Sequence, residues 1–123
     1  LMPDFDPPAE RKWSGEPVQA WGAGQIRFEP VSGQGLAASV VAQAHVTVRA
    51  RAAGDRLPRG PGRPRAGIKQ IAQECGLPPW LRDRVPIVCV DGRPVWMPGC
   101  DIAPPFVAAA DEAGWLPCWH PAV

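Results

Sequence analysis

The chain has 123 residues and a net charge of +1, and 46% of its residues are hydrophobic, including six tryptophans. This content excludes an intrinsically disordered chain, although 17 prolines and 13 glycines predict a loop-rich domain. The apolar runs fall short of the roughly 18 residues that a membrane-spanning helix needs. We therefore expect a cytoplasmic domain that has no membrane partner.

The first predicted elements are a tail and a hairpin. Residues 1–16 open with a proline-rich, charged stretch that has no apolar period, which indicates a linker or flexible tail. Residues 17–21 and 25–30 alternate apolar and polar side chains on either side of a glycine-containing break, which predicts a hairpin. Residues 32–43 are rich in small side chains and leave helix and strand undecided.

The middle of the chain contains the clearest strand, a long loop and a short helix. Residues 44–51 alternate, with valines on one face and arginines on the other. Prolines and glycines argue against regular structure in residues 52–66, and a loop of this length suggests a functional role. Apolar residues at helical spacing predict a helix over 67–75, with Gly76 as its left-handed cap.

The last third predicts a second hairpin and one more strand. Residues 87–90 and 95–97 flank Asp91-Gly92, a strong signal for a two-residue turn. Residues 115–120 could add a last strand, which Pro117 would confine to a sheet edge. We therefore expect an α+β fold: a small, β-sandwich-like domain of hairpin-rich mixed sheets with one short central helix.

Positive charge is concentrated in residues 49–69, which hold seven basic residues against the single acidic residue Asp55. The planar arginine fork suits phosphate oxygens, and a helix start attracts anions. From charge alone, the alternative is a solvated basic loop that keeps the protein soluble. Trp80 could stack on a base or ribose, although a tryptophan after two prolines more often fills a core. The candidate phosphate-binding residues are Arg49, Arg51, Arg56, Arg59, Arg63, Arg65, Lys69, Arg82 and Arg84.

Catalytic and metal-binding patterns are missing from the sequence. The four cysteines, Cys75, Cys89, Cys100 and Cys118, include no C-x-x-C pair, so we expect buried thiols rather than a zinc or redox site. His45 and His120 stand without a nucleophile at a readable spacing, and no glycine-rich phosphate loop occurs. We expect no catalytic residue, no metal and no other cofactor in this chain.

Three motifs in fixed order carry a resemblance to a known family. They read GDRL at 54–57, GIKQIAQE at 67–74 and LPPWLRD at 77–83. In this order and spacing they resemble the C-terminal domain of tRNA(Ile)-lysidine synthase, firmly over 46–102. A related module with an unusual β-sandwich-containing fold occurs in the β subunit of phenylalanyl-tRNA synthetase.

Two positions depart from the family pattern. Gln70 stands where the family has a second lysine, and Ala72 stands where it has an aromatic residue. One phosphate contact is therefore either lost in this chain or taken over by Arg63 or Arg65.

The resemblance implies a role in tRNA modification. The whole enzyme is a ligase that uses ATP, with Mg, to activate the wobble cytidine of tRNA(Ile) and joins lysine to its C2, changing decoding from AUG to AUA. The family's Ser-Gly-Gly-x-Asp-Ser loop for ATP does not occur here, so we expect a fragment that lacks the catalytic domain and is not an enzyme by itself. ATP and lysine would then bind in the absent part of the parent protein.

The implied partners are tRNA(Ile), held on its acceptor-stem side, and the catalytic domain of the same protein. We expect the tRNA-binding domain over 17–103 and a C-terminal extension over 104–123. The alternative is an interaction module that packs on the catalytic domain, or forms a homodimer, without touching RNA.

Overall fold

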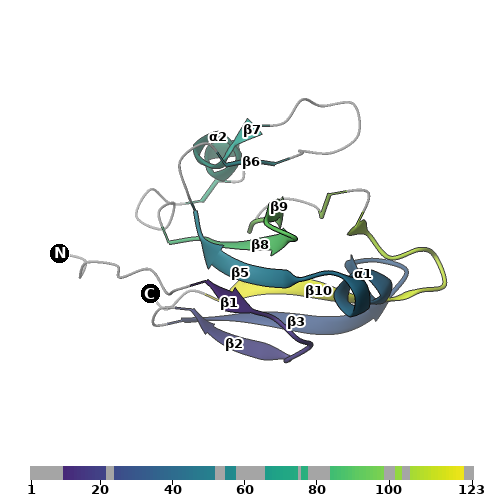
Figure 1. Ribbon diagram of the computed structural model, residues 1–123. Coiled ribbons are helices and arrows are strands. Elements are labelled where there is room, and N and C mark those ends of the chain that lie inside the picture. Colours follow the sequence, from purple (N-terminus) through teal and green to yellow (C-terminus); the bar gives the residue numbers. More distant parts are fainter. Residues whose placement is uncertain are drawn as a thin grey trace.

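Two four-stranded antiparallel sheets make up most of the computed structural model (Figure 1). The first sheet has the order β1 (Arg11–Lys12), β5 (Val46–Ala50), β8 (Pro86–Val90), β9 (Arg93–Trp96). The second has the order β2 (Val18–Trp21), β3 (Gly24–Ser32), β10 (Ala113–His120), β4 (Leu36–Ala37). The remaining elements are helix α1 (Ala38–Gln43), the ladder of β6 (Arg56–Leu57) with β7 (Ala66–Gly67), and helix α2 (Ile68–Glu74). The structure describes residues 10–21, 24–51, 55–57, 66–74, 76–77, 84–98, 102–103 and 106–120.

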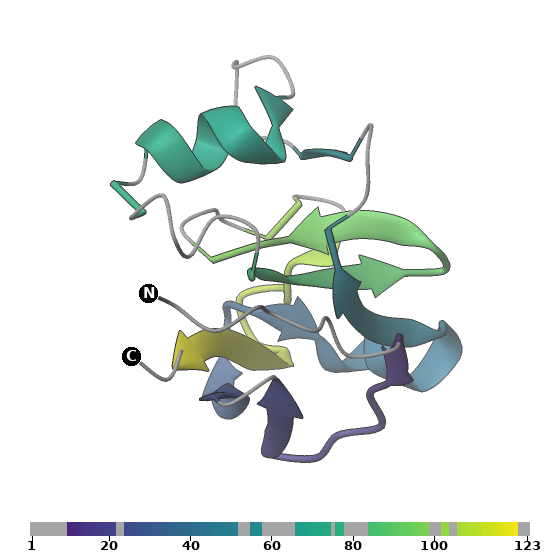
Figure 2. The same ribbon diagram turned by 90° about the vertical axis from the view of Figure 1, so that its left-hand side faces the viewer.

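The first sheet is covered on both faces, which gives the domain three layers. All five residues of β8 are buried, as expected for a strand with no solvent-facing side. Val48 and Val88 face the second sheet, whereas Ile87 and Cys89 belong to a separate cluster with Leu57 of β6. We call β6, β7 and α2 the outer layer, which lies on the far side of the first sheet from β3 and β10 (Figures 1 and 2).

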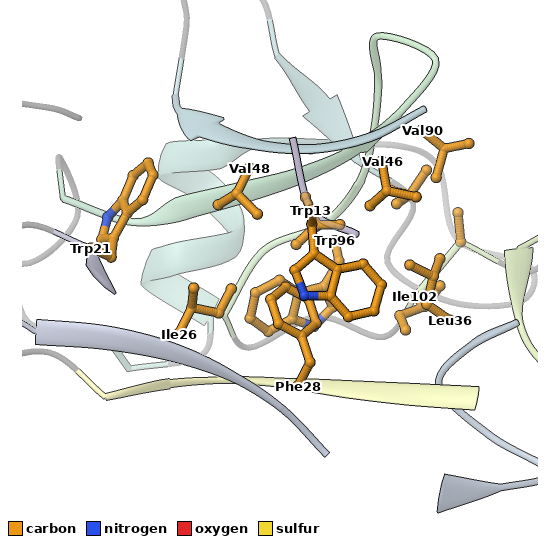
Figure 3. Packing of buried hydrophobic residues seen from close by; sticks show 13 residues of the cluster. Trp13, Trp21, Ile26, Phe28, Leu36, Val46, Val48, Val90, Trp96 and Ile102 are labelled. Atoms are coloured by element: carbon orange, nitrogen blue, oxygen red, sulfur yellow. The ribbon is translucent and has the colours of Figure 1, made fainter. Parts of the chain in front are cut away.

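Aromatic side chains fill the space between the two sheets. Trp13 stacks on Phe28 with ring centroids 4.3 Å apart, and its edge meets Trp115 at 5.3 Å. Figure 3 shows Trp13 and Phe28 at the centre of this cluster, with Trp96 beside them. Burying one such side chain contributes about 1.5–3 kcal/mol, so this cluster is the main source of cohesion between the sheets.

Both predicted hairpins and the predicted central strand are confirmed. β2 pairs with β3, and β5 pairs with β8 over its whole length. Between β8 and β9, Asp91 has φ 49° and Gly92 has φ 82°. Two consecutive residues at positive φ are the mark of a type I′ turn, whose twist matches that of the strands it joins.

The predicted helix is confirmed as α2, and Gly76 ends it with φ 73°. The Gly76 amide donates to the carbonyl of Gln73 at 3.2 Å, and the Leu77 amide donates to that of Ala72 at 2.9 Å. These two bonds form a Schellman motif, which satisfies carbonyls left open at the helix end. Ile71 and Ala72 are buried against the first sheet, as the apolar stripe predicted.

The structure places strands beyond both ends of the expected 17–103 domain. Residues 10–16, expected in a flexible tail, include β1 and Trp13, which is only 1% exposed. Residues 113–120, expected in an extension, pair with β3 along their whole length as β10. Both segments are therefore part of the packed core, because each supplies a strand to a sheet.

The edge position expected for Pro117 applies to half of β10. β4 pairs only with Gly114 and Trp115, so in the described structure β10 has a single neighbour, β3, at Pro117. Proline has no backbone N–H group and cannot donate a hydrogen bond to a neighbouring strand. It is tolerated where β10 has a neighbour on one side only.

The fold class is confirmed, with two differences of detail. The described sheets are antiparallel rather than mixed. The described residues form two short helices instead of one, since α1 forms within the undecided stretch 32–43. The loop over 52–66 was expected to lack regular structure, but Arg56–Leu57 and Ala66–Gly67 pair near its ends. Leu57 of this short ladder is fully buried.

Candidate nucleic-acid interface

The basic segment lies where the first sheet meets the outer layer. β5 carries Arg49 on the face opposite Val48, so Arg49 points towards the outer layer. The chain then crosses to β6 and returns through β7 into α2, which lies beside the ladder (Figure 1). The described parts of the segment therefore lie on and just after β5, in the β6–β7 ladder and at the start of α2.

Arg49 forms an ion pair with Asp55, the single acidic residue of the basic segment. Nη1 donates to Oδ2 and Nη2 donates to Oδ1, both at 2.9 Å, and Nη1 also donates to the Ala50 carbonyl at 3.0 Å. The two side chains are 21% and 9% exposed. This paired geometry is the strongest arrangement available to an arginine and a carboxylate. The hydrogen bonds that Arg49 donates to Asp55 raise the pKa of Arg49, so the guanidinium stays charged.

Cys89 lies in the same cluster of groups, on the strand beside β5. Thr47 and Cys89 are ladder partners, and this pair lies two residues along the strands from the pair of Arg49 and Ile87. Burial raises the pKa of the Cys89 thiol, and this outweighs the opposite effect of the nearby Arg49 charge. The thiol is therefore protonated at neutral pH and acts as a small apolar group rather than as a nucleophile.

The other predicted site residues have different surroundings. The Arg56 side chain is exposed on β6, and Lys69 belongs to the first turn of α2. Arg51 and Arg84 are partly buried, and the Arg84 carbonyl accepts a hydrogen bond from Trp21 Nε1 at 2.6 Å. Arg59, Arg63, Arg65, Trp80 and Arg82 lie outside the described residues.

Sequence reasoning missed the role of Asp55, although it noted this residue as the one acid among seven bases. A single acidic residue within a basic segment indicates an ion pair with one of the neighbouring basic residues. What the sequence could not supply was its distance to Arg49, six residues earlier. The pair neutralises one arginine, and it leaves a segment that is still strongly basic.

The two thiols in the described part of the chain differ in exposure. Cys89 is buried as expected, but Cys118 is exposed, because it alternates with the inward-facing Trp119 on β10.

Among the described residues, no group of three or more His, Cys, Asp or Glu side chains could hold a metal ion. None of the described helices is long and apolar enough to cross a membrane.

Fold and charge together define a small, mostly-β domain with basic residues on its outer layer. The chain matches the model of the TilS substrate C-terminal domain over residues 46–119, and it belongs to that family. This match confirms the family resemblance seen in the motifs.

The chain is also similar to proteins named tRNA(Ile)-lysidine synthase, which is consistent with this family. The chain is 44% identical over 89% of its length to the tRNA(Ile)-lysidine synthase of Azoarcus sp., 38% over 95% to that of Aromatoleum aromaticum, and 39% over 96% to that of Methylococcus capsulatus. These matches cover 24%, 28% and 27% of the relatives, so the chain spans about a quarter of their length.

Proposed function

We propose that this chain is the tRNA-holding C-terminal domain of a cytoplasmic tRNA(Ile)-lysidine synthase. The family description and the names of the relatives support the parent activity. In that activity, ATP activates the wobble cytidine of tRNA(Ile) and lysine becomes attached to its C2. ATP, Mg and lysine would bind in a catalytic domain outside this chain, so the chain itself acts on tRNA position and not on bond making.

The proposed interface is a clamp on the phosphates of tRNA(Ile), on its acceptor-stem side. The observation that carries it is the position of two basic residues on the outer layer: Arg56 is exposed on β6, and Lys69 lies in the first turn of α2. α2 has only seven residues, so side-chain charge rather than the helix end supplies the attraction. Phosphate contacts of this kind position a nucleic acid without reading its sequence.

The remaining basic candidates extend the same proposal. Arg51 directly follows β5, and Arg84 lies two residues before the start of β8, the strand that the outer layer covers. Arg59, Arg63, Arg65 and Arg82 are proposed as further phosphate contacts, and Trp80 as a stacking residue, from their sequence positions alone.

Filter binding of a tRNA(Ile) transcript at two salt concentrations tests the clamp. Affinity should fall as salt rises, by roughly 0.7–0.9 log unit per phosphate contact for each tenfold increase in salt. Arg56→Ala should weaken binding about tenfold, the effect of one charge-assisted hydrogen bond, and should reduce the salt slope.

The matched control is Arg27→Ala. Arg27 is an exposed arginine on β3, in the second sheet, so its removal changes the total charge equally without touching the outer layer. Salt-independent binding, or an equal loss in both variants, would contradict the clamp.

One observation favours the alternative of an interaction module. Val18 and Leu116 are 40% and 39% exposed on the second sheet, on the face that carries Arg27 and Glu29. That face could pack on the catalytic domain or on a second copy of the chain. Leu116→Asp should then abolish association in sedimentation velocity, and Arg56→Ala should change neither association nor tRNA binding. The clamp predicts instead that Arg56→Ala weakens tRNA binding and that Leu116→Asp does not.

A further inference from the structure

We propose that Asp55 and Arg49 form a positioning pair that holds β6 in register, so that Arg56 faces tRNA, and that Arg49 itself makes no phosphate contact. This inference rests on the proposed function and deepens it. It assigns a role in RNA binding to an acidic residue, and it removes one arginine from the set of direct contacts.

The first argument is that the pair engages both terminal nitrogens of Arg49. Both terminal nitrogens donate to Asp55 at 2.9 Å, and Nη1 donates in addition to the Ala50 carbonyl. A guanidinium in this geometry would have to give up two charge-assisted hydrogen bonds before it could turn to a phosphate. The side chain is also only 21% exposed, so a phosphate has little access to it.

The second argument comes from the alternation along β6. Asp55 is 9% exposed and Leu57 is 0% exposed, whereas Arg56 between them is exposed. Successive side chains of a strand point to opposite sides, so Asp55 and Leu57 face the first sheet together and Arg56 faces away. A slip of one residue would turn Arg56 into the core and Leu57 into solvent.

The third argument concerns the kind of contact that fixes the register of β6 among the described residues. Its ladder with β7 has two residue pairs, Arg56 with Gly67 and Leu57 with Ala66. Leu57 fills an apolar cluster with Ile71 and Ile87, and such contacts have no direction. The paired hydrogen bonds of Asp55 are directional, so they supply the orientation that the apolar contacts lack.

Removing the Asp55 charge tests the proposal, because electrostatics and positioning predict opposite changes in tRNA affinity. Asp55→Asn raises the net charge by one, so long-range electrostatics alone predicts tighter tRNA binding. A positioning role predicts the reverse, because the basic segment loses its register although it gains charge. Asp55→Glu keeps the carboxylate on a longer side chain and should restore most of the binding.

The experiment measures tRNA(Ile) affinity by filter binding for the unmodified chain, Asp55→Asn, Asp55→Glu and Arg49→Lys. We expect Asp55→Asn to bind about tenfold more weakly, Asp55→Glu to stay within about threefold of the unmodified chain, and Arg49→Lys to fall between them, since lysine keeps the charge but loses the fork. Equal or tighter binding by a folded Asp55→Asn variant overturns the proposal.

A second readout, taken without RNA, separates this inference from the proposed function. Amide hydrogen exchange over residues 55–57 and 66–67 should speed up in Asp55→Asn and stay slow in Asp55→Glu, relative to exchange in β3. Unchanged exchange in Asp55→Asn overturns the positioning pair even if tRNA binds. Faster exchange in a chain that binds no tRNA supports the pair and refutes the clamp. If Asp55→Asn does not fold, Arg49→Lys is decisive, and unchanged affinity and exchange in that variant overturn the proposal.

Discussion

Leu57→Ala tests whether the outer layer is an integral part of the domain. Leu57 is 0% exposed on β6 and packs in the apolar cluster that joins the outer layer to the first sheet. Truncating a fully buried leucine to alanine costs about 2–5 kcal/mol, from the lost transfer free energy and the cavity left behind. At about 4 °C per kcal/mol for a domain of this size, a cost of about 3 kcal/mol lowers the melting temperature by roughly 12 °C.

The matched control is Leu36→Ala in the cluster between the two sheets. Leu36 is 1% exposed, so the two variants remove the same atoms from equally buried sites in different clusters. Urea unfolding at equilibrium should give costs of similar size for both. Leu57→Ala alone should also speed up amide exchange at Ile71 and Ala72, because these residues share its cluster.

One outcome would refute the three-layer description. If Leu57→Ala costs less than about 1 kcal/mol while Leu36→Ala costs several, the outer layer opens separately from the sheets. The basic segment would then be attached to a locally unfolding unit, and the register argument for Arg56 would lose its basis.

Three further predictions follow from packing and ionisation. Gly114→Ala should cost about 3 kcal/mol in urea unfolding, because an added Cβ would overlap a backbone carbonyl oxygen of the loop before β4, and a neutral result would show that this loop can shift. In the folded chain Cys118 should react with a maleimide far faster than Cys89, as peptide mass mapping can show; equal rates would contradict the burial of Cys89 and its raised pKa. Hydrogen bonds from the Ser39 side chain and from backbone amides lower the pKa of Glu112, so its stabilising effect is present above its ordinary pKa and is lost as pH falls through the lowered one. Glu112→Gln should therefore destabilise the chain at pH 7 but much less at pH 3, and a pH-independent difference in urea midpoints would rule this out.

Local patterns predicted the elements whose signals lie within a few residues. Asp91-Gly92 predicted the β8–β9 turn because only a few residue types accept two successive positive φ angles. The stripe through Ile71 and the glycine at position 76 predicted α2 and its end in the same way. The basic composition of the candidate site was also readable, since charge can be counted along the chain.

The site's internal organisation depended on contacts that no local pattern contains. The alternation of β5 placed Arg49 opposite the valines, but not beside Asp55, because the intervening chain has no period from which a distance follows. A list of basic residues therefore counted Arg49 as a phosphate contact. The ion pair is the reason we propose a positioning role for it instead.

The sequence by itself determined the family, the hairpins, the central strand, helix α2 and the excess of positive charge in one segment, because motifs, periodicity and composition are local properties. The tertiary structure alone decided which segments form the core and what stabilises α1. That helix starts with no side-chain cap of its own, and its Ser39 amide donates instead to Glu112, 73 residues away, at 3.2 Å. Trp13 and β10 likewise join the core through partners distant in sequence. Such contacts form only when the sheets pack, since apolar burial repays the ordering of distant segments only after they meet.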